Sequence, residues 1–340
     1  MLVSVIITCY NLERYIAQAI DSVINQDFDS RLYEILVVDD CSNDHSPEII
    51  KSYKNICYLR TNRNLGVLGA TIFGLENSTG ELIFFLDGDD LWELSKLSIV
   101  VERFKNNSKT ALITHDLNYI GSNGCELKKR SRSEIVMSDI SLLMVSDTIR
   151  NGILFHSDFV WLGSAYAVHR KLGNVADFCS FAKTLPNCFD TYQDWPLAYW
   201  VACQSDVLFD YDNHKLFRYR LHGMNYSGDA SSVAKSIRNL HRTYNTMKAI
   251  NDISVLFDAP TSVKAVTRRK LNFLVYLIHL YNGHRWFATK LFFISLPYLL
   301  TGPVSFWKEA VRFFGLQLFG VKFFVMLTVS WNSSLKKFVK

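Results

Sequence analysis

Glycine, proline and charged residues are all scarce in this sequence. The 340 residues include 16 Gly and 6 Pro, which excludes collagen-like, linker-rich and low-complexity chains. Only 20% of the residues are charged and 49% are apolar, so the chain is not intrinsically disordered. The mean hydropathy of +0.07 is high for a freely soluble enzyme, which indicates that some apolar surface faces something other than water.

No CxxC pair or zinc-type spacing occurs among the seven cysteines, and their number is odd. We therefore expect reduced thiols of a cytosolic protein rather than a disulfide framework. Cys9 and Cys57 fall in apolar runs typical of strands, where a cysteine is expected to be buried. The N-terminus shows no basic region and no small-residue cleavage site, so we expect no signal peptide.

Acidic residues are almost absent after residue 258. Residues 259–340 contain twelve Lys or Arg and one acid, Glu309, a balance of +11, whereas residues 1–258 contain 25 bases and 31 acids, a balance of −6. A basic tail on an acidic body suggests an anionic partner, either a membrane or nucleic acid.

A clean membrane-spanning run is also missing from this tail. The uncharged run Leu291–Trp307 has 17 residues and is interrupted by Pro297 and Gly302-Pro303. Residues 286–331 combine many Phe and Trp with interspersed Lys and Arg, which is typical of helices lying in an anionic membrane interface. Nucleic acid is not expected as a partner, because its binding sites are polar surfaces. A buried core or an oligomer interface is the alternative for these helices.

The first hundred residues alternate short apolar runs with helical patterns, which predicts an α/β sheet flanked by helices. We expect an irregular, substrate-facing insertion from about residue 115 to 160. Strands are expected at Val3–Thr8, Ile35–Val38, Ile56–Leu59, Leu82–Leu86, Ala111–Thr114, Ala165–Val168 and Lys215–His222. Helices are expected at Leu12–Gln26, from Ser46, at about 68–77 and 92–105, and at 231–250 and 262–281.

Three carboxylates, Asp87, Asp89 and Asp90, stand at the carboxyl end of the strand Leu82–Leu86. In an open α/β sheet this edge is where ligands bind. Carboxylates this close repel each other unless a cation neutralises them, and Mg²⁺ or Mn²⁺ with open positions for phosphate oxygens suits them. A solvated loop with an Asp helix cap is the alternative.

Polar residues also follow two other strands of the predicted sheet. Asp39 and Asp40 end the second strand, and Thr8, Tyr10 and Asn11 end the first. Because the carboxyl ends of parallel strands meet at one sheet edge, the three turns together predict a nucleotide site.

These motifs resemble those of family 2 inverting glycosyltransferases of GT-A fold. The resemblance rests on residues 3–11, 37–44, 64–66 and 79–90, which read VSVIITCYN, VVDDCSND, NLG and TGELIFFLDGDD. It implies a catalytic domain at about 1–230, with a Rossmann-like mixed sheet flanked by helices. A helical C-terminal region at 231–340 would follow, with its membrane-associating helices at about 286–331.

The resemblance also implies roles for individual residues. Thr8, Tyr10, Asn11, Asp39 and Asp40 would surround the base and ribose of a nucleotide-diphosphate sugar, and Asp87 the ribose or sugar. Asp89 would hold Mn²⁺ or Mg²⁺.

Two further roles lie downstream in the sequence. Asp194, which follows Gln193 where the family often has Glu-Asp, would be the general base on the acceptor hydroxyl, although it could instead cap a helix. His222, in a segment resembling His-x-x-Asn-x-Ser, would complete the metal site or touch the diphosphate, although a strand-end His is often a surface residue.

One departure from the family pattern stands out. Many relatives have Ala-Arg-Asn where this chain has Ala70-Thr71-Ile72, so a basic residue near the donor is missing. Arg60, Arg63 or Arg220 could replace it.

The sequence as a whole predicts a metal-dependent glycosyltransferase of bacterial surface polysaccharide or glycolipid assembly. The expected acceptor is a lipid-linked glycan or a growing polysaccharide, and the expected location is the cytoplasmic face of the cell membrane. A non-catalytic membrane scaffold of the same fold is one alternative. A phosphatase with Asp87 as nucleophile is another, but it expects Thr or Val where Leu91 stands.

Overall fold

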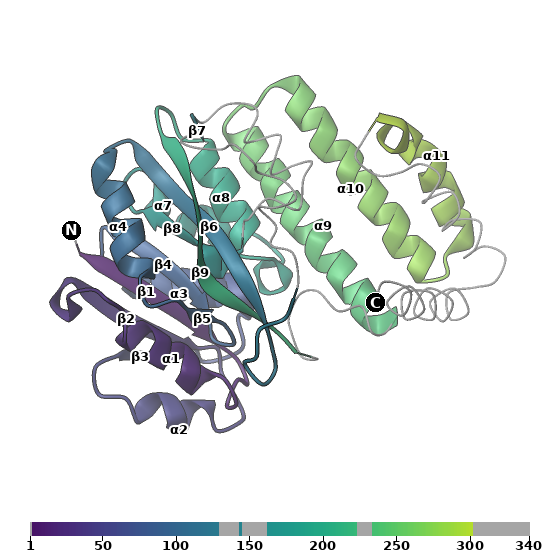
Figure 1. The fold of residues 1–340 in the computed structure, drawn as a ribbon. Coiled ribbons are helices and arrows are strands. Elements are labelled where there is room, and N and C mark those ends of the chain that lie inside the picture. Colours follow the sequence, from purple (N-terminus) through teal and green to yellow (C-terminus); the bar gives the residue numbers. More distant parts are fainter. Residues whose placement is uncertain (1, 129–142, 145–161, 223–232, 302–340) are drawn as a thin grey trace. The chain divides into compact units, whose positions relative to one another are not determined.

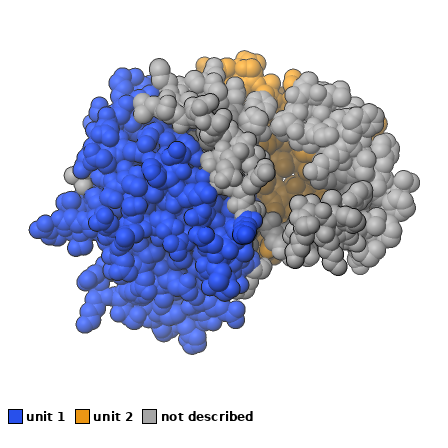
Figure 2. All heavy atoms as spheres, viewed as in Figure 1, with its two compact units in different colours: residues 1–222 blue, residues 223–340 orange. Residues whose placement is uncertain are grey.

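The computed structural model describes residues 2–128, 143–144, 162–222 and 233–301. The chain divides into two compact units, residues 1–222 and 223–340 (Figure 2). The boundary expected at residue 230 falls among residues 223–232, outside the described part of the chain.

The first unit contains a parallel half-sheet in the order β3–β2–β1–β4. β-branched residues fill its two inner strands, β1 and β2, which favour the pleated conformation. Its strands are β1 (Val3–Cys9), β2 (Tyr33–Asp39), β3 (Cys57–Arg60) and β4 (Leu82–Asp87).

The second half of the sheet is mixed, and brings the described sheet to nine strands. β8 pairs antiparallel with both β4 and β6, β9 runs parallel to β6, and β5 and β7 are antiparallel to β9. The bounds are β5 (Leu91–Trp92), β6 (Thr110–Gly121), β7 (Leu143–Met144), β8 (Tyr166–His169) and β9 (Leu208–Leu221).

Helices cover both faces of this sheet, as the strand periodicity requires (Figure 1). Odd-numbered residues of β1, such as Val5 and Ile7, join the core cluster that contains the buried face of α1. On the other face, Gly74 of α3 lies directly over Ile6. The helices are α1 (Ile16–Ile24), α2 (Ser46–Lys51), α3 (Gly66–Asn77), α4 (Lys96–Asn106), α7 (Val175–Lys183) and α8 (Asp194–Ala202). The short 3₁₀ turns are η1 (Ser30–Leu32), η2 (Gly163–Ala165) and η3 (Cys188–Asp190).

The amphipathic spacing predicted for the first helix is confirmed. Ile16, Ala19, Ile20 and Val23 of α1 are completely buried against the sheet. Each buried Ile or Val contributes about 1.5–3 kcal/mol relative to an exposed one, so this face holds α1 on the strands that carry the site.

Several predicted elements need correction. The third strand is a half-exposed edge strand rather than one covered on both faces, and Cys57 on it is exposed. The fourth helix begins at Lys96 rather than Trp92, because residues 91–92 form β5 against β9. Residues 115–121 belong to β6 and not to an irregular insertion. Residues 129–142 and 145–161 of that insertion lie outside the described residues.

Both predicted helices of the second unit are present, and a third follows. They are α9 (Val233–Leu256), α10 (Thr261–Tyr281) and α11 (Arg285–Thr301). α10 and α11 share an apolar cluster that includes Tyr276, Leu280 and Phe292. Of the tail 286–331, residues 302–331 lie outside the described part. Among the described helices, none combines the length and the apolar character needed to cross a membrane.

Candidate active site

The ends of β1, β2 and β4 bring the three predicted polar turns to one edge of the sheet. Thr8 pairs with Val38 on one side and with Asp87 on the other, and Cys9 pairs with Asp39. The parallel register therefore places Asp39, Asp40 and Asp87 around the end of β1, as the sequence predicts.

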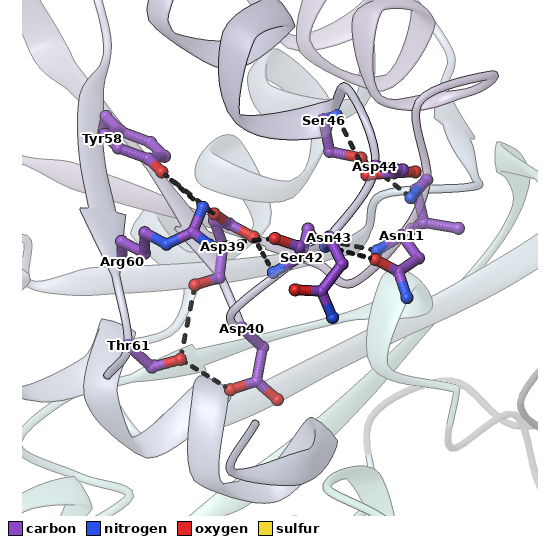
Figure 3. A network of polar contacts seen from close by, with 11 residues as sticks. Asn11, Asp39, Asp40, Ser42, Asn43, Asp44, Ser46, Tyr58, Arg60 and Thr61 are labelled. Atoms are coloured by element: carbon purple, nitrogen blue, oxygen red, sulfur yellow. Dashed lines mark hydrogen bonds and ion pairs between the residues drawn. The ribbon is translucent and has the colours of Figure 1, made fainter. Parts of the chain in front are cut away.

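Asp39 is the centre of a hydrogen-bond network at the end of β2 (Figure 3). Its Oδ2 accepts from Arg60 Nη1 at 2.6 Å and from Tyr58 Oη at 3.0 Å, and its Oδ1 accepts from Ser42 N at 2.9 Å. The side chain is completely buried, so the guanidinium supplies the charge that a buried carboxylate needs. These contacts hold the Asp39 side chain in one position at the end of β2.

Asp40 joins the end of β2 to the segment that enters α3. Its Oδ1 accepts from Thr61 Oγ1 at 3.0 Å and from Leu65 N at 2.7 Å. Burial raises the pKa of Asp40 above its ordinary value, and these hydrogen bonds oppose the shift. Asp40 therefore positions this loop as well as standing at the predicted donor edge.

Asn11 connects the first turn to the second. It has a positive φ of 54°, a conformation that Asn tolerates better than most residues. Its backbone N–H donates to Ser42 Oγ at 2.9 Å, and its side-chain Oδ1 accepts from Asn43 N at 2.8 Å (Figure 3). Its neighbour Tyr10 is 43% exposed, which leaves an aromatic surface at this edge.

Asp87 ends β4 between two hydrogen-bond donors. Gln193 Nε2 donates to its Oδ1 at 3.0 Å, and Thr8 Oγ1 lies 3.4 Å from the same atom. Burial, together with the negative charges of Asp89 and Asp194, raises the pKa of Asp87 to about 7. This clustering of carboxylates favours a cation nearby.

Asp89 and His222, the two predicted metal ligands, are in contact. His222 Nε2 lies 2.8 Å from Asp89 Oδ2, and the His222 side chain is almost completely buried. The His222 ring also packs on Tyr15 at a centroid distance of 4.8 Å. His222 is therefore a buried residue with fixed contacts in the site and not an exposed surface residue.

The described residues contain no group of three or more His, Cys, Asp and Glu side chains arranged to hold a metal. A site made of one carboxylate and one imidazole leaves most coordination positions to other ligands. Mg²⁺ and Mn²⁺ accept that arrangement when phosphate oxygens and water fill the rest. The residues present therefore fit a metal that is completed by a bound diphosphate.

Arg220 stabilises the loop that carries Asp89 through hydrogen bonds. Its Nε donates to the Asp89 carbonyl at 2.7 Å, its Nη2 donates to Gln18 Oε1 at 2.9 Å, and its guanidinium lies over the ring of Tyr15. The side chain is buried, so this charge lies inside the site.

A buried network below the motif, centred on Ser164, was not predicted from the sequence. Ser164 Oγ donates to Asp90 Oδ2 at 2.8 Å and accepts from Asp87 N at 3.0 Å, while its carbonyl accepts from Lys96 Nζ at 2.5 Å. Burial lowers the pKa of Lys96 and raises that of Asp90. The sequence feature that could have indicated this network is Lys96, a cation within the apolar pattern of a helix. Ser164, on a short 3₁₀ turn, has no comparable feature.

Asp194 lies in the first turn of α8, where its Oδ1 accepts from Trp195 N at 3.0 Å. Its charge raises the pKa of Asp87, and contributes to the raised pKa of the buried Tyr166. Asp194 thus lies close enough to Asp87 to raise its pKa. Gln193, the neighbour of Asp194, contacts Asp87 directly although 106 positions separate the two in the sequence.

The three cations that could replace the missing basic residue lie in three different environments. Arg60 pairs with Asp39, and Arg220 holds the backbone of Asp89. Arg63 is exposed. Thr71 itself contacts the side chain of Gln193.

The mixed sheet flanked by helices, with polar turns at the ends of β1, β2 and β4, is that of the GT-A fold of nucleotide-sugar transferases. Residues 4–170 match the profile of glycosyl transferase family 2. The N-terminal unit of the chain belongs to this family, and the protein is a glycosyltransferase.

Curated relatives agree with this assignment. An uncharacterized glycosyltransferase of Haemophilus influenzae is 28% identical over 269 residues, which are 75% of this chain and 77% of that protein. The poly(ribitol-phosphate) β-N-acetylglucosaminyltransferase TarS of Staphylococcus aureus is 37% identical over 91 residues, but these are 26% of this chain and only 16% of TarS.

Solved structures support the fold. Residues 1–349 of S. aureus TarS in complex with UDP-GlcNAc superpose with a TM-score of 0.58 at 18% identity, covering 82% of this chain and 73% of that one. A mannosyltransferase of Pyrobaculum calidifontis in complex with GDP-Man and Mn²⁺ has a TM-score of 0.51 at 16% identity, covering 93% of this chain and 80% of that one. The family match and the curated relatives, which identify a glycosyltransferase, count against both the phosphatase and the non-catalytic scaffold.

Proposed function

We propose that the protein transfers a sugar, with inversion and with a divalent metal, from a nucleotide diphosphate to an acceptor hydroxyl. The observation that carries this proposal is the convergence of Asp39, Asp87, Asp89, Asp194 and His222 at one edge of the sheet. A donor, a metal and a general base each have a matching group there.

The donor would lie over the ends of β1 and β2. Tyr10 offers an exposed ring for the base, and Thr8, Asn11, Asp39 and Asp40 would surround the base and ribose. TarS and the archaeal mannosyltransferase are bound to UDP-GlcNAc and GDP-Man respectively, which supports a nucleotide-sugar donor of this class. Asp87, at the end of β4, would face the ribose or the sugar.

Asp89 and His222 would hold Mn²⁺ or Mg²⁺ together with the donor diphosphate. The metal, when bound, stabilises the negative charge that builds up on the leaving diphosphate. Arg220 fixes the loop backbone, so that the Asp89 carboxylate is directed by the fold rather than by the ligand. The Mn²⁺ in the mannosyltransferase complex is consistent with this use of a divalent ion.

Asp194 would act as general base. It takes the proton of the acceptor hydroxyl while the hydroxyl oxygen bonds to the anomeric carbon and the bond from that carbon to the diphosphate breaks. Attack from the side opposite the diphosphate inverts the anomeric configuration.

The acceptor is proposed to be a lipid-linked glycan or a growing surface polysaccharide at the cytoplasmic face of the membrane. α11 exposes Trp286, Phe287, Phe293 and Ile294, which recur at helical spacing along one face. Residues 259–301 add six Lys or Arg and no acid. Such a surface suits anionic headgroups and their acyl boundary. The acceptor in the name of TarS, a poly(ribitol phosphate), is a polymer of comparable character.

A ligand panel tests the function. Thermal shifts are measured with UDP-, GDP-, dTDP- and CMP-linked sugars, with and without Mn²⁺, followed by nucleotide release for each ligand that binds. A ligand that binds only the native state raises Tm by mass action, so one donor class should stand out and should require the metal. A chain that binds no member of the panel, with Mn²⁺ present, would contradict the proposal.

A further inference from the structure

Gln193 connects three elements of the active site. Its Nε2 donates to Asp87 Oδ1 at 3.0 Å at the end of β4, and its Oε1 accepts from the Thr71 hydroxyl on α3. Its backbone stands at the N-cap of α8, one residue before Asp194. A single side chain therefore links the donor-side carboxylate to the helix turn that carries the proposed base.

The contact between Gln193 and Thr71 is neutral and dry. Gln193 is 6% exposed and Thr71 is 1% exposed. A buried amide is costly unless its donor and acceptor both have partners. Here Asp87 accepts from Nε2, and Oε1 contacts the Thr71 hydroxyl, which also has the Val67 carbonyl within hydrogen-bond distance. Asp87 therefore receives its amide N–H from a side chain that is itself buried.

The surroundings leave Gln193 little freedom. A Cβ built on Gly163 would meet Gln193 Nε2 at 2.4 Å, so only glycine at that position leaves room for the amide. Ser164, the next residue, donates to Asp90 and accepts from the backbone of Asp87. The η2 turn thus supports both the amide and the loop that the amide contacts.

We propose that Gln193 is a positioning residue that sets the distance between Asp87 and Asp194, and so aligns the general base with the bound donor. This inference rests on the proposed function.

The test uses Gln193→Met, which keeps the length of the side chain and removes both polar atoms. Gln204→Met is the matched control, because Gln204 follows the end of the same helix and its side chain bonds only to the Trp200 carbonyl among the contacts described. The probes are UDP-GlcNAc and GDP-mannose with Mn²⁺, and the measurement is donor hydrolysis, in which water takes the place of the acceptor. Tm is recorded for every variant.

We expect kcat of Gln193→Met to fall about 10- to 100-fold, as is typical when a group that orients a site residue is lost. In an Asp194→Asn background the same change should lower kcat less than about 3-fold. This variant has no general base, so moving residue 194 out of position has little left to affect. Gln204→Met should match the wild type. A role in stability alone would lower Tm and leave kcat of the folded protein unchanged.

Equal losses from Gln193→Met in the two backgrounds would overturn the inference, as would full hydrolysis by the folded Gln193→Met protein. The link to Asp87 is also measurable without any donor. The Tm changes of Gln193→Met and Asp87→Ala should be less than additive, because each removes one partner of the same hydrogen bond; strict additivity would contradict the link. If the wild type binds no donor, the proposed function is contradicted. The Tm measurement would still test the contact between Gln193 and Asp87, because it needs no donor.

Discussion

His222 Nε2 lies 2.8 Å from Asp89 Oδ2, although 133 positions separate the two residues in the sequence. β9 delivers His222 to the site, because its pairing with β6 and β5 fixes where the strand ends. The pair offers one carboxylate oxygen and one imidazole nitrogen to a common point. It is the basis of the first prediction.

Donor binding should depend on this pair and on a divalent metal. Asp89→Asn and His222→Ala should each weaken donor binding in Mn²⁺ by about 100-fold or more, because each removes a proposed ligand and metal sites lose 10- to 100-fold even from outer-shell changes. Isothermal titration calorimetry measures the loss. Excess EDTA should reproduce it in the wild type.

Asp206→Asn is the control for these variants. Asp206 has a φ of 55°, which Asn also tolerates, and it pairs with Lys109 on the surface. It should bind donor like the wild type. Undiminished donor binding and turnover in EDTA would show that the enzyme needs no metal.

Asp194→Asn should separate catalysis from donor binding. The amide keeps the shape of the carboxylate but cannot take a proton, so kcat should fall by about 10²–10⁴ while the donor Kd changes little. Asp190→Asn changes an acid four residues earlier, on the η3 turn, and should retain activity. If Asp194→Asn loses donor affinity as strongly as turnover, Asp194 belongs to the donor site instead.

The cysteines should differ sharply in their reaction with a thiol reagent. Burial raises the pKa of Cys9 to about 12 and that of Cys179 to about 11, so both should remain thiols and unreactive at pH 8. Cys57 and Cys125 are exposed and should be alkylated in the native protein. Peptide mass spectrometry after brief iodoacetamide treatment measures this order. Native labelling of Cys9 as fast as Cys57 would contradict the placement of β1 inside the sheet.

Cys57 also illustrates why an edge strand is hard to predict. The run Ile56–Leu59 is as apolar as an inner strand, but only the pairing of strands shows that β3 has a single neighbour. Val3–Thr8 and Leu82–Leu86, in contrast, are buried on both faces, and their β-branched and aromatic content predicts them almost to their ends.

The site residues also differ in how far the sequence predicts them. Asp39, Asp40, Asp87 and Asp89 follow apolar strands, and because parallel strands end at one edge, sequence reasoning could group them. The contacts of Gln193 could not be predicted, because they depend on how α3, β4 and α8 meet.

The exposed face of α11 should bind anionic membranes. Trp286, Phe287, Phe293 and Ile294 are 71%, 54%, 60% and 48% exposed, while Ala288 and Phe292 on the opposite face are buried. Trp286→Ser with Phe293→Ser removes two apolar groups from this face and leaves the buried side unchanged. Vesicle sedimentation with phosphatidylglycerol should show weaker binding of the double variant.

The control for this face is Leu94→Ser. Leu94 is 62% exposed in the first unit, so its replacement removes exposed apolar surface outside α11, and this variant should bind vesicles like the wild type. High salt should release the wild type only in part, because salt screens the basic residues over about 8 Å at physiological ionic strength but leaves apolar insertion intact. The double variant should come off at much lower salt, since charge alone would hold it. If the double variant and the wild type bind and elute alike, α11 does not enter the membrane, and the lipid-linked acceptor loses its main support.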